Sequence, residues 1–156
     1  MLRIKHIIEE GKELDIIRDL FREYEKELNE DICFQSFEEE LKYPLKKYGP
    51  PSGDLMLAYW DDAIAGCIAL AKTKEPEACE MKRLYVKPSF RKNKIGRLLI
   101  EDLLNSAKER DYKKMRLDTF LKLQPAVHLY QQFGFKNISA YYNNPLPGVV
   151  YMEKEL

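Results

Sequence analysis

The fold is decided by one stretch of the chain, Met81 to Leu99, whose sequence is MKRLYVKPSFRKNKIGRLL. Its first part has the composition of a β-strand that Pro88 ends, and apolar residues at helical spacing begin at Ile95. The loop between them is basic, with Arg91, Lys92 and Lys94. Free N–H groups and the positive end of the helix dipole meet at a helix start, so this arrangement predicts a phosphate site. The glycine patterns of a P-loop and of a dinucleotide fingerprint are absent.

Upstream of this stretch, the sequence predicts a meander of three antiparallel strands. The strands span Leu55 to Trp60, Ile64 to Lys72 and Cys79 to Lys87, and turn-forming residues at Asp61-Asp62 and Glu75 to Glu77 separate them.

The N-terminal part of the chain predicts a strand and two helices. Leu2, Ile4 and His6 alternate with basic residues, as in a short strand. The apolar spacing from Leu14 to Leu28 is that of an amphipathic helix. Ser36 followed by Glu39 is a capping-box pattern, which predicts a shorter helix from Phe37 towards Tyr43, ending before Pro44.

The C-terminal part predicts further alternation of helices and strands. The helix that begins at Ile95 ends near Arg110, and a strand follows from Met115 to Phe120. Pro125 suits the first turn of a helix over Ala126 to Phe133, and Gly134 suits its end. Two strands, Phe135 to Ser139 and Gly148 to Lys154, complete the order β-α-α-β-β-β-α-β-α-β-β. This order predicts one α+β domain over residues 1–156, an α/β sandwich whose mixed, mostly antiparallel sheet is flanked by helices.

Composition excludes several classes of protein. Basic and acidic residues both number 26, so no net charge attracts a nucleic acid. The longest apolar run, Ile64 to Ala71, is too short to cross a membrane, and the N-terminus has no apolar signal region, which predicts a cytoplasmic protein. Cys33, Cys67 and Cys79 have no metal-ligand spacing and are expected to be small buried residues. His6 and His128 lack a partner pattern and are expected to be incidental.

Two motifs give the chain a resemblance to a known family. Arg91 and Gly96 occupy the first and last positions of the pyrophosphate loop of the GNAT superfamily of N-acetyltransferases, although Lys94 stands where that family has its first glycine. A second motif, LYQQFGF from Leu129 to Phe135, resembles the Leu-Tyr-x-x-x-Gly-Phe motif of the same family. If the position of Lys94 requires a positive φ, lysine costs on the order of 1 kcal/mol relative to glycine there.

The resemblance implies an acetyltransferase that uses acetyl-CoA and no metal. It implies that the coenzyme binds at Leu84, Tyr85, Val86, Arg91, Lys92, Asn93, Lys94, Ile95, Gly96 and Arg97. It also implies that Glu80 is the general base, because a lysine-like ammonium with a pKa near 10.4 must lose a proton before it attacks. Tyr130 would face the sulfur, and Tyr141, Tyr142 and Asn143 would help to form the acceptor pocket.

Other interpretations remain open from the sequence. Glu80 fits a surface carboxylate paired with Lys82, Tyr130 fits a buried core residue, and the basic loop fits an ordinary solvated helix start. The acceptor is expected to be the primary amine of a small molecule or amino acid, reached by direct transfer. The alternatives are a protein N-terminus or lysine, or a non-catalytic module that senses CoA. Acidic residues at 38–40 and at Glu23, Glu25, Glu27 and Glu30 fit either a surface that attracts a cation or solvated helix, and a homodimer is left open.

Overall fold

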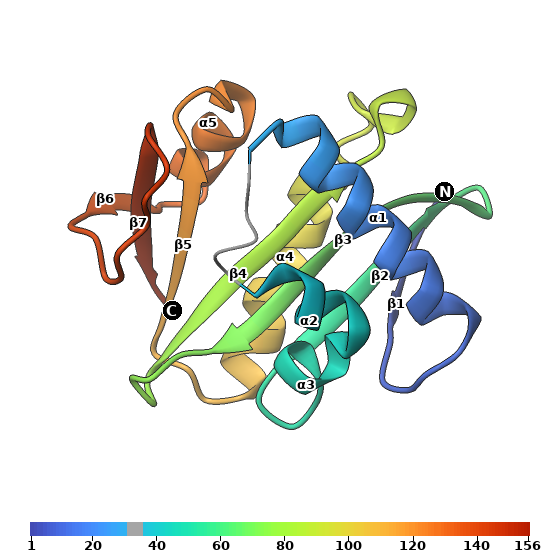
Figure 1. Ribbon diagram of the computed structural model, residues 1–156, viewed down its shortest axis with the longest axis horizontal. Helices are drawn as coiled ribbons and strands as arrows, with labels where there is room; N and C mark the ends of the chain where they lie inside the picture. The colour runs from blue at the N-terminus through green and yellow to red at the C-terminus, as the bar shows by residue number, and fades with distance from the viewer. Residues whose placement is uncertain (31–35) are drawn as a thin grey trace.

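The computed structural model describes residues 1–30 and 36–156, which form a seven-stranded sheet with helices on both faces. The strands are ordered β1-β2-β3-β4-β5-β7-β6 across the sheet (Figure 1). In chain order the elements are β1 (Leu2–His6), α1 (Lys12–Leu28), α2 (Phe37–Lys42), α3 (Pro44–Tyr48), β2 (Asp54–Trp60), β3 (Ala63–Lys72), β4 (Ala78–Val86), a 3-10 turn (Pro88–Phe90), α4 (Ile95–Glu109), β5 (Lys114–Phe120), α5 (Gln124–Gln132), β6 (Lys136–Ile138) and β7 (Val149–Glu155).

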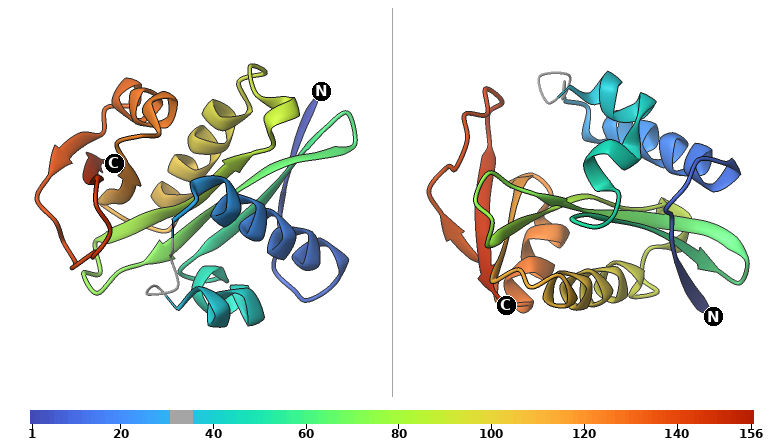
Figure 2. Two further views of the ribbon diagram at one scale, coloured as in Figure 1. Left: turned by 45° about the horizontal axis from the view of Figure 1, so that its top comes forward. Right: turned by 90° about the horizontal axis from the view of Figure 1, so that it is seen from below.

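The predicted fold class is confirmed. All neighbouring strands are antiparallel except β4 and β5, which run parallel. Helices α1, α2 and α3 lie on one face of the sheet, and α4 and α5 lie on the other (Figure 2).

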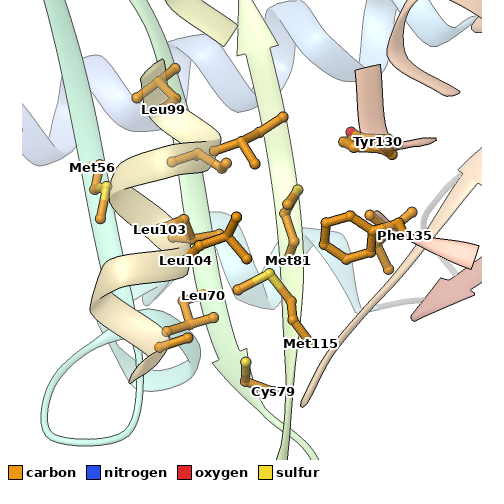
Figure 3. Packing of buried hydrophobic residues seen from close by; sticks show 14 of the residues in the cluster. Met56, Leu70, Cys79, Met81, Leu99, Leu103, Leu104, Met115, Tyr130 and Phe135 are labelled. Atoms are coloured by element: carbon orange, nitrogen blue, oxygen red, sulfur yellow. The ribbon is translucent and has the colours of Figure 1, made fainter. Parts of the chain in front are cut away.

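Both faces of the central strands are buried, so each face has its own apolar core. On one face, Met56 and Leu70 pack with Leu99, Leu103 and Leu104 of α4 (Figure 3). On the other face, Leu55 and Leu57 belong to a second cluster with residues of α1 and α2. Double-sided burial explains why β2 and β3 are nearly continuous apolar runs rather than alternating ones.

The sheet opens between β4 and β5. These strands pair only from Ala78 opposite Lys114 to Glu80 opposite Arg116, after which they diverge (Figure 1). The strands on either side are paired along most of their length, β4 with β3 and β5 with β7. The opening therefore splits the molecule into two antiparallel halves that are joined at one end.

A β-bulge in β4 accompanies this opening. Between the pairs Cys67–Tyr85 and Ala69–Lys82 the strand β4 has one extra residue, and Arg83 within it adopts φ +59°. A bulge bends its strand and increases the local twist, which directs the remainder of β4 away from β5. A Cβ atom on Gly66, which pairs with Val86 beyond the bulge, would lie 2.3 Å from the Tyr85 carbonyl oxygen, so this position requires glycine.

The bulge is held by a buried ion pair with α2. The Arg83 guanidinium donates from Nε to Glu40 Oε2 at 2.8 Å and from Nη2 to Glu40 Oε1 at 3.0 Å. Both side chains are at most 5% exposed. Glu40, expected to belong to a solvated or cation-attracting acidic surface, is therefore a buried structural residue.

Near α2 the sequence analysis missed one helix and predicted one cap that does not form. The helix does end before Pro44, but Pro44 itself begins a further helix, α3, because proline is well tolerated in a first turn, where its missing N–H is not needed. The capping box does not form, because Ser36 has left-handed backbone angles (φ 60°, ψ 40°) instead of the extended ones that such a cap uses, and its side chain makes no cap hydrogen bond.

The cysteine prediction is confirmed where the structure describes it. Cys67 and Cys79 are buried free thiols, and burial raises the pKa of Cys79 to about 12. Cys33 lies outside the described residues. Within the described ranges, no helix combines the length and apolar character that a membrane span requires.

Replacing Glu40 by alanine is expected to lower the free energy of unfolding by about 3–5 kcal/mol, because Arg83 would remain buried without its counter-charge. Glu39→Ala is the matched control, since Glu39 pairs with Lys46 at the surface and its loss should cost less than about 1 kcal/mol. Urea unfolding of the two variants measures the difference. Equal small losses would contradict the structural role of the buried pair.

The same ion pair predicts a pH dependence of stability. Burial opposes ionisation of Glu40, but the charge and hydrogen bonds of Arg83 outweigh it and lower the pKa of Glu40 below its ordinary value. A lowered folded-state pKa contributes stability that is present above the unfolded-state pKa and is lost as pH falls through the folded one. Glu40→Gln should therefore lose less stability than the wild type on acidification below about pH 4.5.

Candidate functional site

A long groove follows the opening between the strands. It has a volume of about 630 Å³ and lies among the C-terminal half of β4, the start of α4, α5 and the end of α1. Among its lining residues are nine of those predicted to hold the coenzyme: Leu84, Tyr85, Val86, Arg91, Lys92, Lys94, Ile95, Gly96 and Arg97. Asn93 does not line the groove; its side-chain amide donates to the Phe90 carbonyl at 3.1 Å and so closes the loop.

The start of α4 brings to this groove amides for which the described residues supply no backbone acceptor. The first α-helical hydrogen bond runs from the Leu98 N–H to the Lys94 carbonyl at 3.2 Å, so the N–H groups of Ile95, Gly96 and Arg97 precede the helical ladder. Lys94 has φ +60° and Lys92 has φ +79°. The position where the family pattern has glycine therefore does require a left-handed backbone, and lysine adopts it here at a cost in free energy.

The basic side chains around the loop have different roles. Arg91 is held in place, because its Nη2 donates to Glu27 at 2.6 Å and its Nε donates to the Val86 carbonyl at 2.9 Å. Arg97 donates to Gln132 of α5. Lys92 and Lys94 are exposed and form no ion pair with any other part of the described chain. These two lysines remain available to an anion in the groove.

Acidic residues in α1 and just after it neutralise nearby cations. Glu23 lies 3.3 Å from Lys87, Glu27 pairs with Arg91, and Glu30 lies 2.8 Å from Lys122. Each of these three carboxylates pairs with a cation of this same chain, so these three do not form an uncompensated acidic surface.

An inner chamber lies at the point where β4 leaves β5. It is small, about 30 Å³, and shares Tyr24, Leu28 and Leu84 with the groove. Tyr130 and Asp118 also line it. The groove therefore adjoins the chamber that Tyr130 lines.

Tyr130 is a buried core residue that also lines the chamber. Its ring packs edge-on against Phe135 at 6.0 Å between centroids and belongs to the core beneath α4 (Figure 3), and it also lines the chamber. Burial raises the pKa of Tyr130 well above its ordinary value, and Tyr24 and Asp118 raise it further. The phenol is therefore protonated throughout the physiological range, which makes it a hydrogen-bond donor and a weak acid.

An outer cavity of about 460 Å³ lies on the other side of the chamber. It contains Glu80, Tyr141, Tyr142 and Asn143, the four remaining residues that the sequence singled out. Lys82 lines both this cavity and the chamber. Groove, chamber and outer cavity thus form one series of neighbouring spaces, and each shares wall residues with the next.

Hydrogen bonds tie the carboxylates of this region to the tyrosines. Tyr141 donates to Glu80 Oε2 at 2.6 Å, and Tyr142 donates to Asp118 Oδ2 at 2.6 Å. Lys82 Nζ lies 3.8 Å from Glu80 and 3.9 Å from Asp118, so the suggested pairing of Glu80 with Lys82 exists as well. Burial and these carboxylates raise the pKa of both tyrosines well above the ordinary value.

Sequence reasoning missed several residues of the outer cavity. These are the cationic residues Lys47, Lys72, Lys74 and Arg116; Asp118, which lines the neighbouring inner chamber, was also missed. They come from α3, the β3–β4 turn and β5, so no local pattern links them. One sequence signal was available. Side chains alternate between the two faces along a strand, so Arg116 and Asp118 of β5 lie on the same face.

The two histidines line none of these spaces. His6 Nδ1 lies 2.8 Å from the buried Asp54, and Ser106 also donates to Asp54. His128 is exposed and lies 3.0 Å from Gln132. His6 therefore has a structural partner far from the groove that the sequence did not indicate.

Comparison with known proteins gives consistent matches. The model of the family described as "Acetyltransferase (GNAT) family" matches residues 14–135. An uncharacterised N-acetyltransferase of Schizosaccharomyces pombe is 43% identical over 146 residues, which cover 93% of this chain and 90% of that protein.

Solved structures share the fold across the whole chain. An acetyltransferase from Streptococcus agalactiae has a TM-score of 0.82 at 21% identity, covering 99% of this chain and 98% of that one. A GNAT family acetyltransferase from Elizabethkingia anophelis with acetyl-CoA bound has a TM-score of 0.71 at 24% identity, with 99% and 98% coverage. At these identities the likeness concerns the fold.

Lys94→Gly is expected to raise the free energy of unfolding by on the order of 1 kcal/mol, because glycine adopts a positive φ without the clash that a Cβ atom makes. Lys108→Gly is the control: it lies within α4, where glycine should lower stability by about 1 kcal/mol. Denaturant unfolding measures both. Destabilisation by Lys94→Gly would contradict the left-handed geometry of the loop.

Proposed function

The chain belongs to the GNAT acetyltransferase family and is an N-acetyltransferase, and we propose that it transfers an acetyl group from acetyl-CoA directly to the primary amine of a small molecule or amino acid. One domain over residues 1–156 would perform the reaction. The observation that carries this proposal is the series of adjoining spaces, in which a groove with free amides leads past Tyr130 to a cavity that contains Glu80.

The groove suits the donor. The amides that precede the helical ladder of α4 would bind the diphosphate of acetyl-CoA, and Lys92 and Lys94 would add positive charge. Gly96 lines the groove, and a Cβ atom there would lie 3.7 Å from Leu129 Cδ2 and 3.9 Å from Val86 Cγ2. The pantetheine arm would follow the edge of β4 towards the chamber, where the thioester would lie beside Tyr130.

The edge of β4 offers hydrogen-bond donors to the acyl group. Arg91 donates to the Val86 carbonyl, so that carbonyl points to the groove side and not towards β3. In a strand the N–H and C=O of one residue point to the same edge, and residues two apart share it. The N–H groups of Val86 and Leu84 would therefore face the thioester, and a donor placed at the developing oxyanion stabilises the tetrahedral transition state.

Glu80 would act as the general base from the outer cavity. The acceptor ammonium loses one proton to Glu80, its nitrogen attacks the thioester carbon, and the carbon–sulfur bond breaks. The second nitrogen proton leaves as the amide forms, so that one of the two protons ends on the CoA sulfur and the other in solvent. Tyr130 would donate a hydrogen bond to the departing sulfur, since its raised pKa makes complete proton transfer unfavourable.

Binding of acetyl-CoA and release of free CoA thiol test this proposal. At a concentration about a hundred times the dissociation constant, CoA should stabilise the protein by about 2.7 kcal/mol, or roughly 5–10 °C in Tm. Gly96→Ala should fold normally and melt no lower, because alanine favours a helix, but should bind CoA more weakly because its methyl group occupies the groove. Turnover should appear with an amine panel. CoA binding without turnover for any amine would support the sensor alternative, and absence of CoA binding would reject the donor assignment.

The pH dependence of the rate should separate the two catalytic roles. Glu80→Gln should lower kcat by roughly a hundredfold near neutral pH, with a smaller loss as the pH approaches the amine pKa near 10.4. Tyr130→Phe should lower kcat by about ten- to a hundredfold at every pH, because the phenol stays protonated. If Glu80→Gln lowers kcat by the same factor at every pH, while the decrease in kcat for Asp118→Asn depends on pH, the general base would be Asp118 instead.

A further inference from the structure

The outer cavity has an excess of positive charge. Its described lining includes five cationic side chains, Lys47, Lys72, Lys74, Lys82 and Arg116, and two carboxylates, Glu75 and Glu80. The chain as a whole has no net charge, so this imbalance is local. A cavity lined mainly by one sign of charge concentrates ligands of the opposite sign.

Two of these cations lack an ion-pair partner. Arg116 is satisfied, since it pairs with Glu75 at 2.6 Å and with Glu153 at 2.8 Å, and Lys82 lies near Glu80 and Asp118. Lys72 and Lys74, at the turn between β3 and β4, form no ion pair with any residue in the ranges that the structure describes. They are exposed and line the cavity mouth.

A third cation of the cavity, Lys47, is repelled by neighbouring positive charges. Lys47 is 37% exposed, and its Nζ lies 3.4 Å from Glu40, a carboxylate that already binds Arg83 through both oxygens. Burial, followed by the charge of Lys82, lowers the pKa of Lys47, and Arg83 contributes in the same direction. An anion within the cavity would relieve this repulsion.

Glu80 gives the same cavity a place for an amine. Glu80 is 13% exposed and accepts a hydrogen bond from Tyr141 through one oxygen, and its other oxygen is 3.8 Å from Lys82. Phenol hydroxyls and the Asn143 side chain also line this cavity. The lining of the cavity thus contains both kinds of group, two lysines without an ion-pair partner among the described residues and a carboxylate that pairs with Lys82 of the inner chamber.

We propose that the acceptor is a small amine that also carries an anionic group, as a free amino acid carries its carboxylate, and that Lys72 and Lys74 bind this group while the amine lies beside Glu80. The inference rests on the proposed function, because it names the acceptor class of the same site. It disfavours a lysine-rich peptide as acceptor, since additional positive charge would meet lysines at the cavity mouth. A carboxylate and a phosphate satisfy the same lysines, so the shared requirement is a small anionic substituent near the amine.

The test compares each acid-bearing amine with the amine that lacks the acid. Amino acids would be paired with their decarboxylated counterparts, such as tyrosine with tyramine, and O-phosphoethanolamine with ethanolamine. The acid-bearing member should have the higher kcat/KM, by about tenfold or more, through a lower KM. The pair that shows the larger difference in kcat/KM, the carboxylate pair or the phosphate pair, identifies the preferred anion. Higher salt should reduce the preference, because exposed lysines are screened.

Variants test the residues that bind the anion. The double variant Lys72→Gln/Lys74→Gln should raise KM for the acid-bearing amine by about tenfold and leave KM for its partner amine and the affinity for CoA unchanged. The double variant Lys12→Gln/Lys108→Gln removes the same charge from exposed positions outside the cavity and should change neither KM. Equal KM increases for both members of a pair would overturn the assignment of the lysines.

The outcomes separate the inference from the function on which it rests. Efficient acetylation of the decarboxylated amines would overturn the anionic acceptor and leave the N-acetyltransferase proposal intact. If CoA binds but no amine is acetylated, calorimetry of the CoA complex with N-acetylated amino acids and N-acetylated amines provides the same comparison without turnover. Preferential binding of the N-acetylated acids would then support the inference, and equal or absent binding would overturn it.

Discussion

The rest of the structure depends on the departure of β4 from β5 after Glu80. A sheet that opens in its middle exposes two rows of backbone donors and acceptors, and such groups need partners. One of these groups has a partner in the chain itself, because Arg91 donates a hydrogen bond to the Val86 carbonyl. The part of β4 that follows Glu80 lines the groove and the chamber. The same exposed backbone that would weaken an ordinary sheet is what a thioester and its pantetheine arm can use.

Keeping the sheet open requires a structural device, and the bulge at Arg83 provides it. A left-handed arginine within a strand is unfavourable, and a buried ion pair contributes little net stability compared with apolar packing. The bidentate contact with Glu40 instead ties the bulge to α2 in one conformation. Lys94 is a second residue with a strained backbone, and it lies beside the groove. The shape of the site therefore reduces the net free energy of folding.

Local patterns predicted those parts of the molecule that local interactions determine. The apolar spacing of α1 and α4 and the strands of the meander follow directly from side-chain periodicity, and the two motifs placed nine residues along one groove. Helix α3 and the failed cap at Ser36 escaped this reasoning, because a proline can end one helix or begin the next, and a serine caps a helix only if its own backbone is extended. The outer cavity could not be predicted, because α3, the β3–β4 turn and β5 meet there only after folding.

Ion pairs neutralise some of the cations in the groove and in the outer cavity, and they leave others without a partner. Near the groove, acidic residues of α1 neutralise Lys87 and Arg91, and the lysines left over are the two on the loop itself, beside the free amides of α4. In the outer cavity, Glu75 and Glu153 neutralise Arg116, and the lysines left over are again two, on a turn at the mouth. In both places, lysines that have no ion-pair partner among the described residues attract anions locally, although the chain as a whole has no net charge. The principle on which we propose a diphosphate in the groove is therefore also the basis of our proposal that the acceptor carries an acid.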